Sequence, residues 1–267
     1  MWLKLPVALI LVMVFSLNLL WCQNETDSSK IVRVLTFNIL HGATTKGDFD
    51  LDLIAGVIRE AKPDLVAMQE VDYKTRRAKD YDLVTELAYR TQLIPLFGKA
   101  MRFDGGEYGE GVLSKYTFIS TRNVALPYTP GNEPRAALEI TTTLPSNDTI
   151  AFVGTHLDHL RDETDRIAQV KKINEVFSAN QYPTILAGDL NDVPGSIAIN
   201  ILEQMWSAAY DKEHIAYTFP SDLPTKKIDY VMWYPKNRWK VLETRVIADA
   251  VASDHCAYLV VLELLDE

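Results

Sequence analysis

Short apolar blocks separated by polar residues run along the chain, and their lengths are those of strands and helices. Residues 31–37 are apolar and β-branched, which predicts a buried strand that ends at Asn38. Residues 50–61 carry apolar side chains at helical spacing and are followed by Pro63, which predicts a helix that ends before the proline. A second apolar run follows at residues 65–68. The chain after the N-terminal region therefore begins with a strand, a helix and a strand.

The same alternation continues to the end of the chain. We predict further helices at residues 81–91, 162–177 and 196–206. We predict further strands at residues 136–144, 149–155, 184–187, 228–234, 239–247 and 256–264. The turn residues 145–148 join the first two of these strands into a β-hairpin, and the glycine-rich residues 105–111 predict a hairpin or a mobile loop. No repeat or linker divides the chain, so we expect one domain over residues 31–267.

The first 22 residues differ in character from the rest of the chain. Lys4 is followed by residues 5–21, which are almost entirely apolar, and this layout is typical of an export signal. The apolar run, about 17 residues, is at the short limit for a membrane-spanning helix, so an uncleaved anchor is the alternative to cleavage. Either way, we expect the domain to be exported.

Cys22 closes the apolar run, and residues 23–30 form a polar, turn-prone tether. A cysteine at such a junction is typical of a lipid-modified protein, although Trp21 stands where those signals usually have a small residue. Ordinary cleavage beside Cys22 is the alternative. The expected location is thus periplasmic, lipid-anchored at the cell surface, or secreted. Membrane association would run through the N-terminal segment or a lipid on Cys22.

The chain is acidic, with 27 Lys and Arg residues against 36 Asp and Glu residues and a net charge of −9. A net negative surface raises the cost of approaching a polyanion, although one local basic groove would be enough to bind DNA. Charge therefore makes nucleic acid a less favoured substrate without excluding it. Besides Cys22 the only cysteine is Cys256, so disulfides do not build the fold.

Polar residues suited to catalysis stand at the ends of the predicted apolar strands: Asn38, Glu70, His156, and Asp189 with Asn191. Side chains at the ends of different strands converge at one edge of a sheet, which predicts a common site. Each residue alone has a structural explanation, such as capping a turn or a helix. The set as a whole favours a functional site, because several independent placements would otherwise have to coincide.

Six segments of the chain resemble, in the same order, motifs of the endonuclease/exonuclease/phosphatase superfamily. Its members include DNase I-like nucleases, abasic-site endonucleases, inositol polyphosphate phosphatases and neutral sphingomyelinases. The segments are Val34-Leu-Thr-Phe-Asn38, Pro63-Asp-Leu-Val-Ala-Met-Gln-Glu70, Gly154-Thr-His156-Leu, Gly188-Asp189-Leu-Asn191, Ile228-Asp229-Tyr-Val and Ser253-Asp254-His255. The resemblance implies a four-layer α/β sandwich, in which helices flank two central, mostly antiparallel sheets. It places the site at one end of the sheets.

The resemblance also implies a metal shell. Glu70 looks like the principal metal carboxylate, with Asn38 and Asp254 completing or flanking the shell. These hard oxygen ligands suit Mg²⁺, with Mn²⁺ as a possible substitute.

The remaining matches are the implied catalytic residues: His156, Asp189, Asn191, Asp229 and His255. Asp189 would position or deprotonate the attacking water, Asn191 would donate to a phosphoryl oxygen, and His156 would contact the phosphate. Asp229 would hold His255, which would act as an acid, a base or a donor to the phosphate.

Metal-dependent hydrolysis of a phosphoester is the activity that these residues predict, because the reaction needs a cation on the phosphoryl oxygens and a base for water. The acidic charge and the export signal favour a phosphodiesterase whose substrate is a lipid or a small phosphoester, and we expect a monomer. A secreted DNase I-like endonuclease is the alternative. A non-catalytic binding module on the same fold is an alternative of another class.

Three further residues lie outside the matching motifs. Two of them have both a functional and a structural interpretation, and the third has only a structural one. Arg135 begins a predicted strand and makes either a phosphate contact or a structural salt bridge. His159 lies near the His156 motif and either lines the pocket mouth or lies on the surface. His41 is interpreted as a structural residue.

Overall fold

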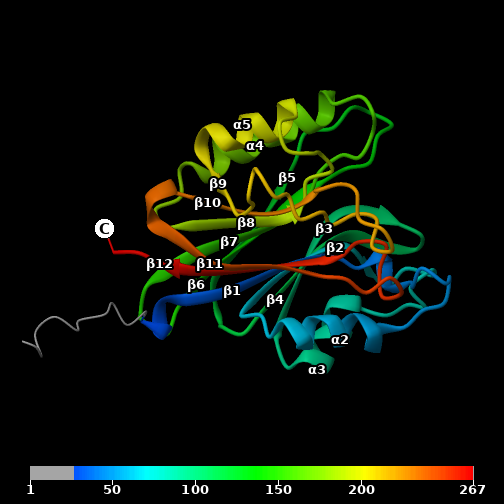
Figure 1. The fold of residues 1–267 in the computed structure, drawn as a ribbon. Coiled ribbons are helices and arrows are strands. Elements are labelled where there is room, and N and C mark those ends of the chain that lie inside the picture. Colours follow the sequence, from blue (N-terminus) through cyan, green and yellow to red (C-terminus); the bar gives the residue numbers. More distant parts are fainter. Residues whose placement is uncertain (1–26, 267) are drawn as a thin grey trace, which may run out of the picture.

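The computed structural model describes residues 27–266 and shows two β-sheets stacked face to face, with helices on the outer face of each (Figure 1). The predicted signal, residues 1–22, and the start of the predicted tether lie outside the described residues. The end of the tether, Ser28–Lys30, is a turn of 3-10 helix directly before the first strand. Within the described part we find no helix that is both long and apolar enough to span a membrane.

The first sheet has six strands in the order β11-β12-β1-β2-β4-β3. They are β1 (Ile31–Asn38), β2 (Leu65–Tyr73), β3 (Ile94–Phe103), β4 (Gly106–Ser114), β11 (Trp239–Ile247) and β12 (Ala257–Leu264). The helix α2 (Leu51–Ala61) is the crossover that makes β1 and β2 parallel. Every other neighbouring pair in this sheet is antiparallel.

The second sheet also has six strands, in the order β5-β6-β7-β8-β10-β9. They are β5 (Phe118–Ala125), β6 (Ala136–Thr143), β7 (Thr149–His156), β8 (Thr184–Asp189), β9 (Ser207–Ala208) and β10 (Asp229–Tyr234). The helix α4 (Thr164–Phe177) crosses between the parallel strands β7 and β8, and the other pairs are antiparallel. The prediction of mostly antiparallel sheets is therefore confirmed.

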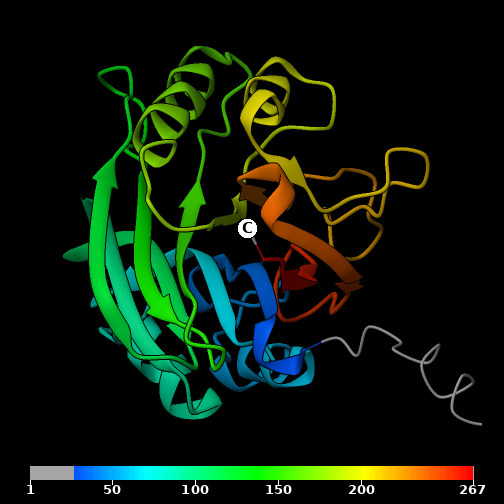
Figure 2. The same cartoon turned by 90° about the vertical axis from the view of Figure 1, so that its left-hand side faces the viewer.

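Three separate apolar clusters hold the four layers together. One lies between the first sheet and the helices α2 and α3 (Leu83–Thr91), with Ile54 and Leu87 in it. A second, including Phe152, lies between the two sheets. The third packs α4 and α5 (Ile197–Met205) on the second sheet through Phe177 and Leu202. The two helix pairs cover opposite outer faces in both views, which confirms the predicted four-layer α/β sandwich (Figure 2).

Side-chain caps decide where three of these helices begin. The carboxylate of Asp50 accepts from the backbone N–H groups of Asp52 and Leu53 at the start of α2. Asp82 accepts from Thr85 at the start of α3, and Ser196 accepts from Ile199 at the start of α5. Such a cap satisfies a backbone donor that has no partner within the helix. The predicted helices are confirmed, with starts displaced by one or two residues.

The glycine-rich residues 105–111 belong to a β-hairpin and not to a mobile loop. The strands β3 and β4 pair antiparallel through the turn at Asp104 and Gly105. A Cβ atom on Gly109 would lie 2.0 Å from the carbonyl oxygen of Gly98, so this glycine allows the two backbones to approach. Of the two interpretations made from sequence, the hairpin is confirmed. The strand β3, which the apolar pattern did not predict, forms the outer edge of this sheet.

Lys227, just before β10, is a charged residue buried in the fold. Its side chain is 1% exposed, and Nζ has no hydrogen-bond partner among the described residues. The ammonium nitrogen lies 3.1 Å from the centroid of the Tyr258 ring. Burial lowers the pKa of Lys227 to about 7, although the nearby Asp229 works in the opposite direction.

We expect Lys227→Met to stabilise the protein by a few kcal/mol at pH 7, since burial lowers the pKa from 10.5 to about 7 and a shift of one pKa unit corresponds to about 1.4 kcal/mol. The unfolded chain binds the proton more tightly than the folded one between pH 7 and about 10.5, so wild-type stability rises with pH across that window. The advantage of the variant should therefore shrink towards pH 9.5 in urea denaturation. The exposed neighbour Lys226, changed to Met, serves as the control. An advantage that does not vary with pH would contradict this account.

Candidate functional site

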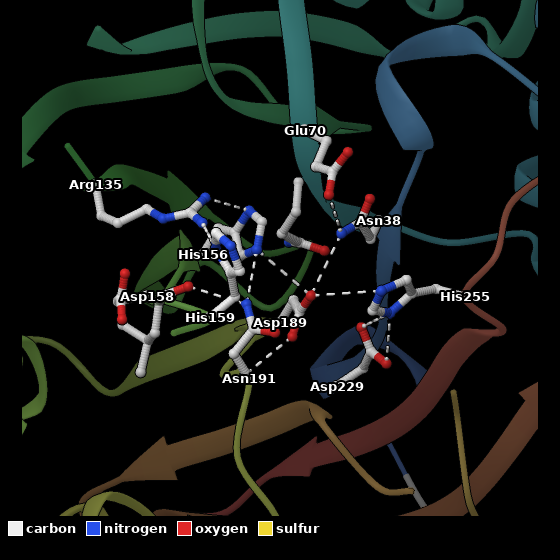
Figure 3. Close-up of polar contacts among 12 residues, drawn as sticks. Asn38, Glu70, Arg135, His156, Asp158, His159, Asp189, Asn191, Asp229 and His255 are labelled. Atoms are coloured by element: carbon white, nitrogen blue, oxygen red, sulfur yellow. Dashed lines mark hydrogen bonds and ion pairs between the residues drawn. The ribbon is translucent and has the colours of Figure 1, made fainter. Parts of the chain in front are cut away.

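A cavity of about 320 Å³ lies where β1, β7 and β8 end. Six of the eight predicted site residues line it: Glu70, His156, Asp189, Asn191, Asp254 and His255. The other two, Asn38 and Asp229, are 1% and 0% exposed and lie beneath the cavity wall. Figure 3 shows Asn38 directed at Glu70 and Asp189, and Asp229 directed at His255. The structure thus brings all eight residues together.

Strand register explains how three of these residues meet. His156 is the last residue of β7 and pairs with Asp189, the last residue of β8. Asp189 in turn pairs with Asp229, the first residue of β10. Residues paired across neighbouring strands project from the same face of the sheet. The two carboxylates and the imidazole therefore form one row across the edge of the second sheet.

Glu70 reaches the site by a different route from the one predicted. The sequence placed it just past the end of a strand, but β2 continues to Tyr73. The pairing of β2 with β4 shifts register between Met68 and Val71, and Glu70 has a φ of 58° within this irregularity. A bulge of this kind redirects a side chain and is common beside active sites. The strained backbone turns the Glu70 carboxylate towards the end of β1.

Asn38 and His41 hold the Glu70 carboxylate from two sides. The amide nitrogen of Asn38 donates to Glu70 Oε1 at 3.2 Å, and His41 Nδ1 lies 3.4 Å from Glu70 Oε2. Burial alone would raise the pKa of Glu70, but the contacts with His41 and Asn38 outweigh it and lower that pKa. The side-chain oxygen of Asn38, Oδ1, accepts from the backbone N–H of Leu40 at 3.1 Å. Asn38 therefore faces the site mainly as a donor.

Asp254 is another carboxylate that lines the cavity. Burial raises its pKa; the nearby His255 lowers it and the negative charge of Glu70 raises it again. Its one side-chain partner among the described residues is the Ser253 hydroxyl, at 3.5 Å. Two carboxylates that disfavour each other's charge fit a divalent cation, which prefers oxygen ligands. The donor set thus suits a hard metal ion.

Asp189 lies at the centre of the site and is 1% exposed. Its Oδ2 atom accepts from Asn38 Nδ2 at 3.3 Å, and lies 3.5 Å from His156 Nε2 and 3.6 Å from His255 Nε2. Burial raises the pKa of Asp189 to about 7, against the opposing charge of His255. A carboxylate whose pKa is near neutrality is suited to accept a proton from water.

Asp229 holds His255 in a charged form. Both oxygens of Asp229 lie 3.1 Å from His255 Nδ1. Burial works against the charged ring, but Asp229 and Asp189 outweigh it and raise the pKa of His255 to about 10. The Ser253 hydroxyl donates to the backbone oxygen of Asn38 at 2.6 Å, which ties this loop to the end of β1.

Asp189, Asp229 and His255 also bring three potential metal-ligand atoms within 4.8 Å of one another. An imidazole nitrogen binds a metal ion only through a free lone pair, so the ring must have lost the proton there. With a pKa of about 10, His255 carries a proton on both nitrogens at neutral pH, and each faces a carboxylate. These three residues therefore form one group in which a charged ring lies between two carboxylates, while Glu70 and Asp254 offer two further carboxylates at the cavity.

The second imidazole, His156, has cationic neighbours. Arg135 Nη1 lies 2.8 Å from His156 Nδ1, and Arg135 Nη2 lies 3.2 Å from His159 Nδ1. Burial and the charge of Arg135 hold the pKa of His156 well below its usual value. The amide nitrogen of Asn191 lies 2.9 Å from His156 Nε2 and donates to the backbone oxygen of Leu157 at 3.0 Å. His255 is thus held charged and His156 neutral on opposite sides of Asp189.

Several cavity residues lie outside the motifs that the sequence analysis singled out. His41, Arg135 and His159 all line the cavity, and so do Arg77, Met101, Phe103, Tyr108, Glu133 and Phe219. For His41 one sequence signal was present, because it lies three residues after Asn38 in the loop that follows β1. The wall formed by Met101, Phe103 and Tyr108 comes from the hairpin of β3 and β4, and the sequence analysis did not predict β3.

Residues 35–255 match the endonuclease/exonuclease/phosphatase family. The endonuclease/exonuclease/phosphatase from Beutenbergia cavernae DSM 12333 is 24% identical, and the match covers 88% of this chain and 72% of that chain with a TM-score of 0.71. A family protein from Bacteroides thetaiotaomicron is 17% identical, with 88% and 98% covered and a TM-score of 0.73. The mannosyl-6-phosphatase of Bacteroides thetaiotaomicron VPI-5482 is 18% identical, with 88% and 100% covered and a TM-score of 0.64. These three structures share the fold of this chain. Because the family match covers most of the length of this chain, the chain belongs to the endonuclease/exonuclease/phosphatase family.

Proposed function

We propose that this chain is a divalent-metal-dependent hydrolase of a small or lipid phosphoester. The observation that carries the proposal is the arrangement of Glu70 and Asp254 beside a buried Asp189 that lies between His156 and His255. This arrangement places a cation site, a proton acceptor and two imidazoles around one cavity. Those are the groups that phosphoester hydrolysis requires.

Glu70 and Asp254 would hold the metal, and Asn38 would keep Glu70 in place through its amide nitrogen. Mg²⁺ is the expected ion, because both ligands offer hard oxygens, and Mn²⁺ is a substitute. A bound cation at this position would neutralise charge on the phosphoryl oxygens.

Asp189 is the proposed base for water, because burial brings its pKa to about 7. It takes a proton from the water as the new phosphorus–oxygen bond forms. The bond to the leaving oxygen breaks with its electron pair on that oxygen, which takes up a proton from solvent and departs as the alcohol. His255, kept charged by Asp229, donates to a phosphoryl oxygen. Asn191 and His156 supply further donors on the other side of Asp189.

The arginines of the cavity favour a small substrate over a polynucleotide. Arg77 makes a two-point contact with the buried carboxylate of Asp72, at 2.6 and 2.8 Å. Arg135 lies 2.9 Å from Glu133. Both arginines are therefore paired with carboxylates, whereas binding of a nucleic-acid backbone needs positive charges that are free to contact its phosphates. The structural neighbour named a mannosyl-6-phosphatase also supports a small phosphoester.

The test is turnover of a substrate panel with Mg²⁺, with Mn²⁺ and with EDTA. The panel contains bis(p-nitrophenyl) phosphate, p-nitrophenyl phosphate, mannose 6-phosphate, sphingomyelin, phosphatidylinositol and plasmid DNA. We expect hydrolysis of a small or lipid ester that EDTA abolishes and Mg²⁺ restores. Cleavage of DNA alone would favour the endonuclease instead. Turnover that survives EDTA, or no turnover on any member, would overturn the proposal, and the latter result would favour a binding module.

Export is also proposed, on the apolar residues 5–21 that precede the described domain, and the protein is proposed to be a monomer. Cell fractionation of the full chain, with a Cys22→Ala variant as the comparison, tests the location and the lipid. Recovery of the wild type in the cytoplasm would contradict export.

A further inference from the structure

We propose that Arg135 is a positioning residue that fixes His156 and His159 as a pair of neutral N–H donors facing the cavity. The inference rests on the proposed phosphoester hydrolysis, and it assigns His159 as a second contact to the oxygens of the substrate. The three side chains lie together on one side of Asp189 (Figure 3). They come from the start of β6 and from the segment that begins at the end of β7.

The argument starts with the guanidinium of Arg135. A guanidinium group has five N–H donors, no acceptor, and no deprotonated form in proteins. Arg135 Nη1 lies 2.8 Å from His156 Nδ1, so that ring nitrogen must accept. A neutral imidazole carries its single proton on the other nitrogen. His156 is therefore held as the tautomer with the proton on Nε2.

The contact on the other side of the His156 ring is also with a nitrogen donor, so the two contacts compete for one acceptor. Asn191 Nδ2 lies 2.9 Å from His156 Nε2, but it also donates to the Leu157 oxygen at 3.0 Å. A carbonyl oxygen accepts only, so the amide nitrogen is required there and the amide cannot turn round. Both ring nitrogens then face nitrogen donors, and only one of them can accept. Arg135 is the charged donor of the two, so its contact decides that Nδ1 accepts. The Nε2–H group then points to the cavity, 3.5 Å from Asp189 Oδ2, where an oxygen of the substrate can also accept from it.

His159 contacts the second terminal nitrogen of the same guanidinium group. Arg135 Nη2 lies 3.2 Å from His159 Nδ1, so this ring too is held with its proton on Nε2. His159 is exposed and lines the same cavity as His156. One guanidinium thus presents two imidazole N–H donors, and these suit the oxygens of a tetrahedral anion.

The position of Arg135 itself is fixed by its surroundings. The side chain is 2% exposed and lies 2.9 Å from Glu133. Burial alone would lower its pKa, but the neighbouring Tyr108, Glu133 and Glu110 outweigh burial and raise it. A buried arginine with its charge balanced in this way holds its orientation better than an exposed one.

The experiment measures the tautomer of His156 directly, by ¹⁵N NMR of protein labelled in the histidine rings, with His156→Gln to assign the signals. In the wild type we expect an unprotonated Nδ1 and a proton-bearing Nε2 at neutral pH. Arg135→Lys should keep that tautomer, because lysine also only donates. Arg135→Gln should populate the form with the proton on Nδ1, because the glutamine oxygen can accept. A wild-type spectrum with Nδ1 protonated would overturn the inference.

Kinetics give the second readout, on whichever panel member is hydrolysed. Arg135→Gln should lower kcat by about 10²-fold, and Arg135→Lys should recover at least about a tenth of the wild-type rate. His159→Phe should lower kcat/KM by about 10-fold without changing the His156 spectrum. Unchanged kcat in Arg135→Gln, or no effect of His159→Phe, would equally refute the assignment.

The matched control is Arg166→Met, since Arg166 is also buried but contacts Asp192 and backbone oxygens and not His156. It should lower thermal stability and leave the His156 tautomer unchanged. Because the NMR measurement needs no turnover, failure of the tautomer assignment is distinguishable from failure of the proposed hydrolysis.

Discussion

Glu70→Gln should lower kcat/KM by about 10³-fold, which corresponds to about 4 kcal/mol of lost transition-state stabilisation. The substitution keeps the size of the side chain and removes its charge. Glu70 is the carboxylate that the β2 bulge directs to the cavity, and its pKa is lowered, so it is charged at neutral pH. Without that charge, Asp254 would be the only remaining carboxylate of the proposed metal pair. The affinity for Mn²⁺, followed by electron paramagnetic resonance, should fall together with the rate.

The matched control for this prediction is Glu60→Gln, because Glu60 is an exposed glutamate on α2, away from the cavity. Its rate and its Mn²⁺ affinity should equal those of the wild type. If Glu70→Gln binds Mn²⁺ as tightly as the wild type but has lost its activity, Glu70 acts in some way other than metal binding. If it keeps both, the proposed metal site is wrong.

The part of the site that could be predicted from sequence depends on strand ends. Asn38, His156 and Asp189 are each the last residue of an apolar strand, and that position can be recognised from the change in hydrophobic pattern. The strands β7, β8 and β10 are neighbours, and their register pairs His156 with Asp189 and Asp189 with Asp229. These three residues therefore lie side by side once the strands have formed. The fold class followed from the same blocks together with the family motifs.

The part that could not be predicted depends on irregularities and on contacts between distant segments. The bulge at Glu70 arises from the pairing of β2 with β4, which no local pattern in β2 reveals. The glycines that let β3 and β4 approach made a strand look like a loop, because glycine is rare inside strands.

Arg135 also has a role that could not be predicted from the sequence. The sequence offered a phosphate contact or a salt bridge, and the structure shows an ion pair with Glu133 together with contacts to two imidazoles. Those contacts join positions 21 and 24 residues apart in the chain. No periodicity connects such positions, so the tautomer of His156 follows only from the folded arrangement.

Asp229→Asn should lower kcat by about 10²-fold at pH 7, and the loss should grow as the pH rises. Burial opposes the charge on His255, and Asp229 is the largest influence that restores it and brings the pKa to about 10. Without Asp229 that pKa falls towards the ordinary value of about 6.5. The ring then loses its proton between pH 6 and 9, a range in which the wild-type ring keeps it.

The measurement is the ratio of wild-type to variant kcat from pH 6 to pH 9. The ratio should rise steadily, because the charged His255 disappears only in the variant. Asp64→Asn is the control, since Asp64 is also buried and bonded, to the backbone N–H of Arg33, but lies at the start of β2, away from the cavity. It should change stability and leave the pH profile unchanged. A flat ratio for Asp229→Asn would mean that the charge on His255 takes no part in the reaction, and Asp229 would then serve only to orient the ring.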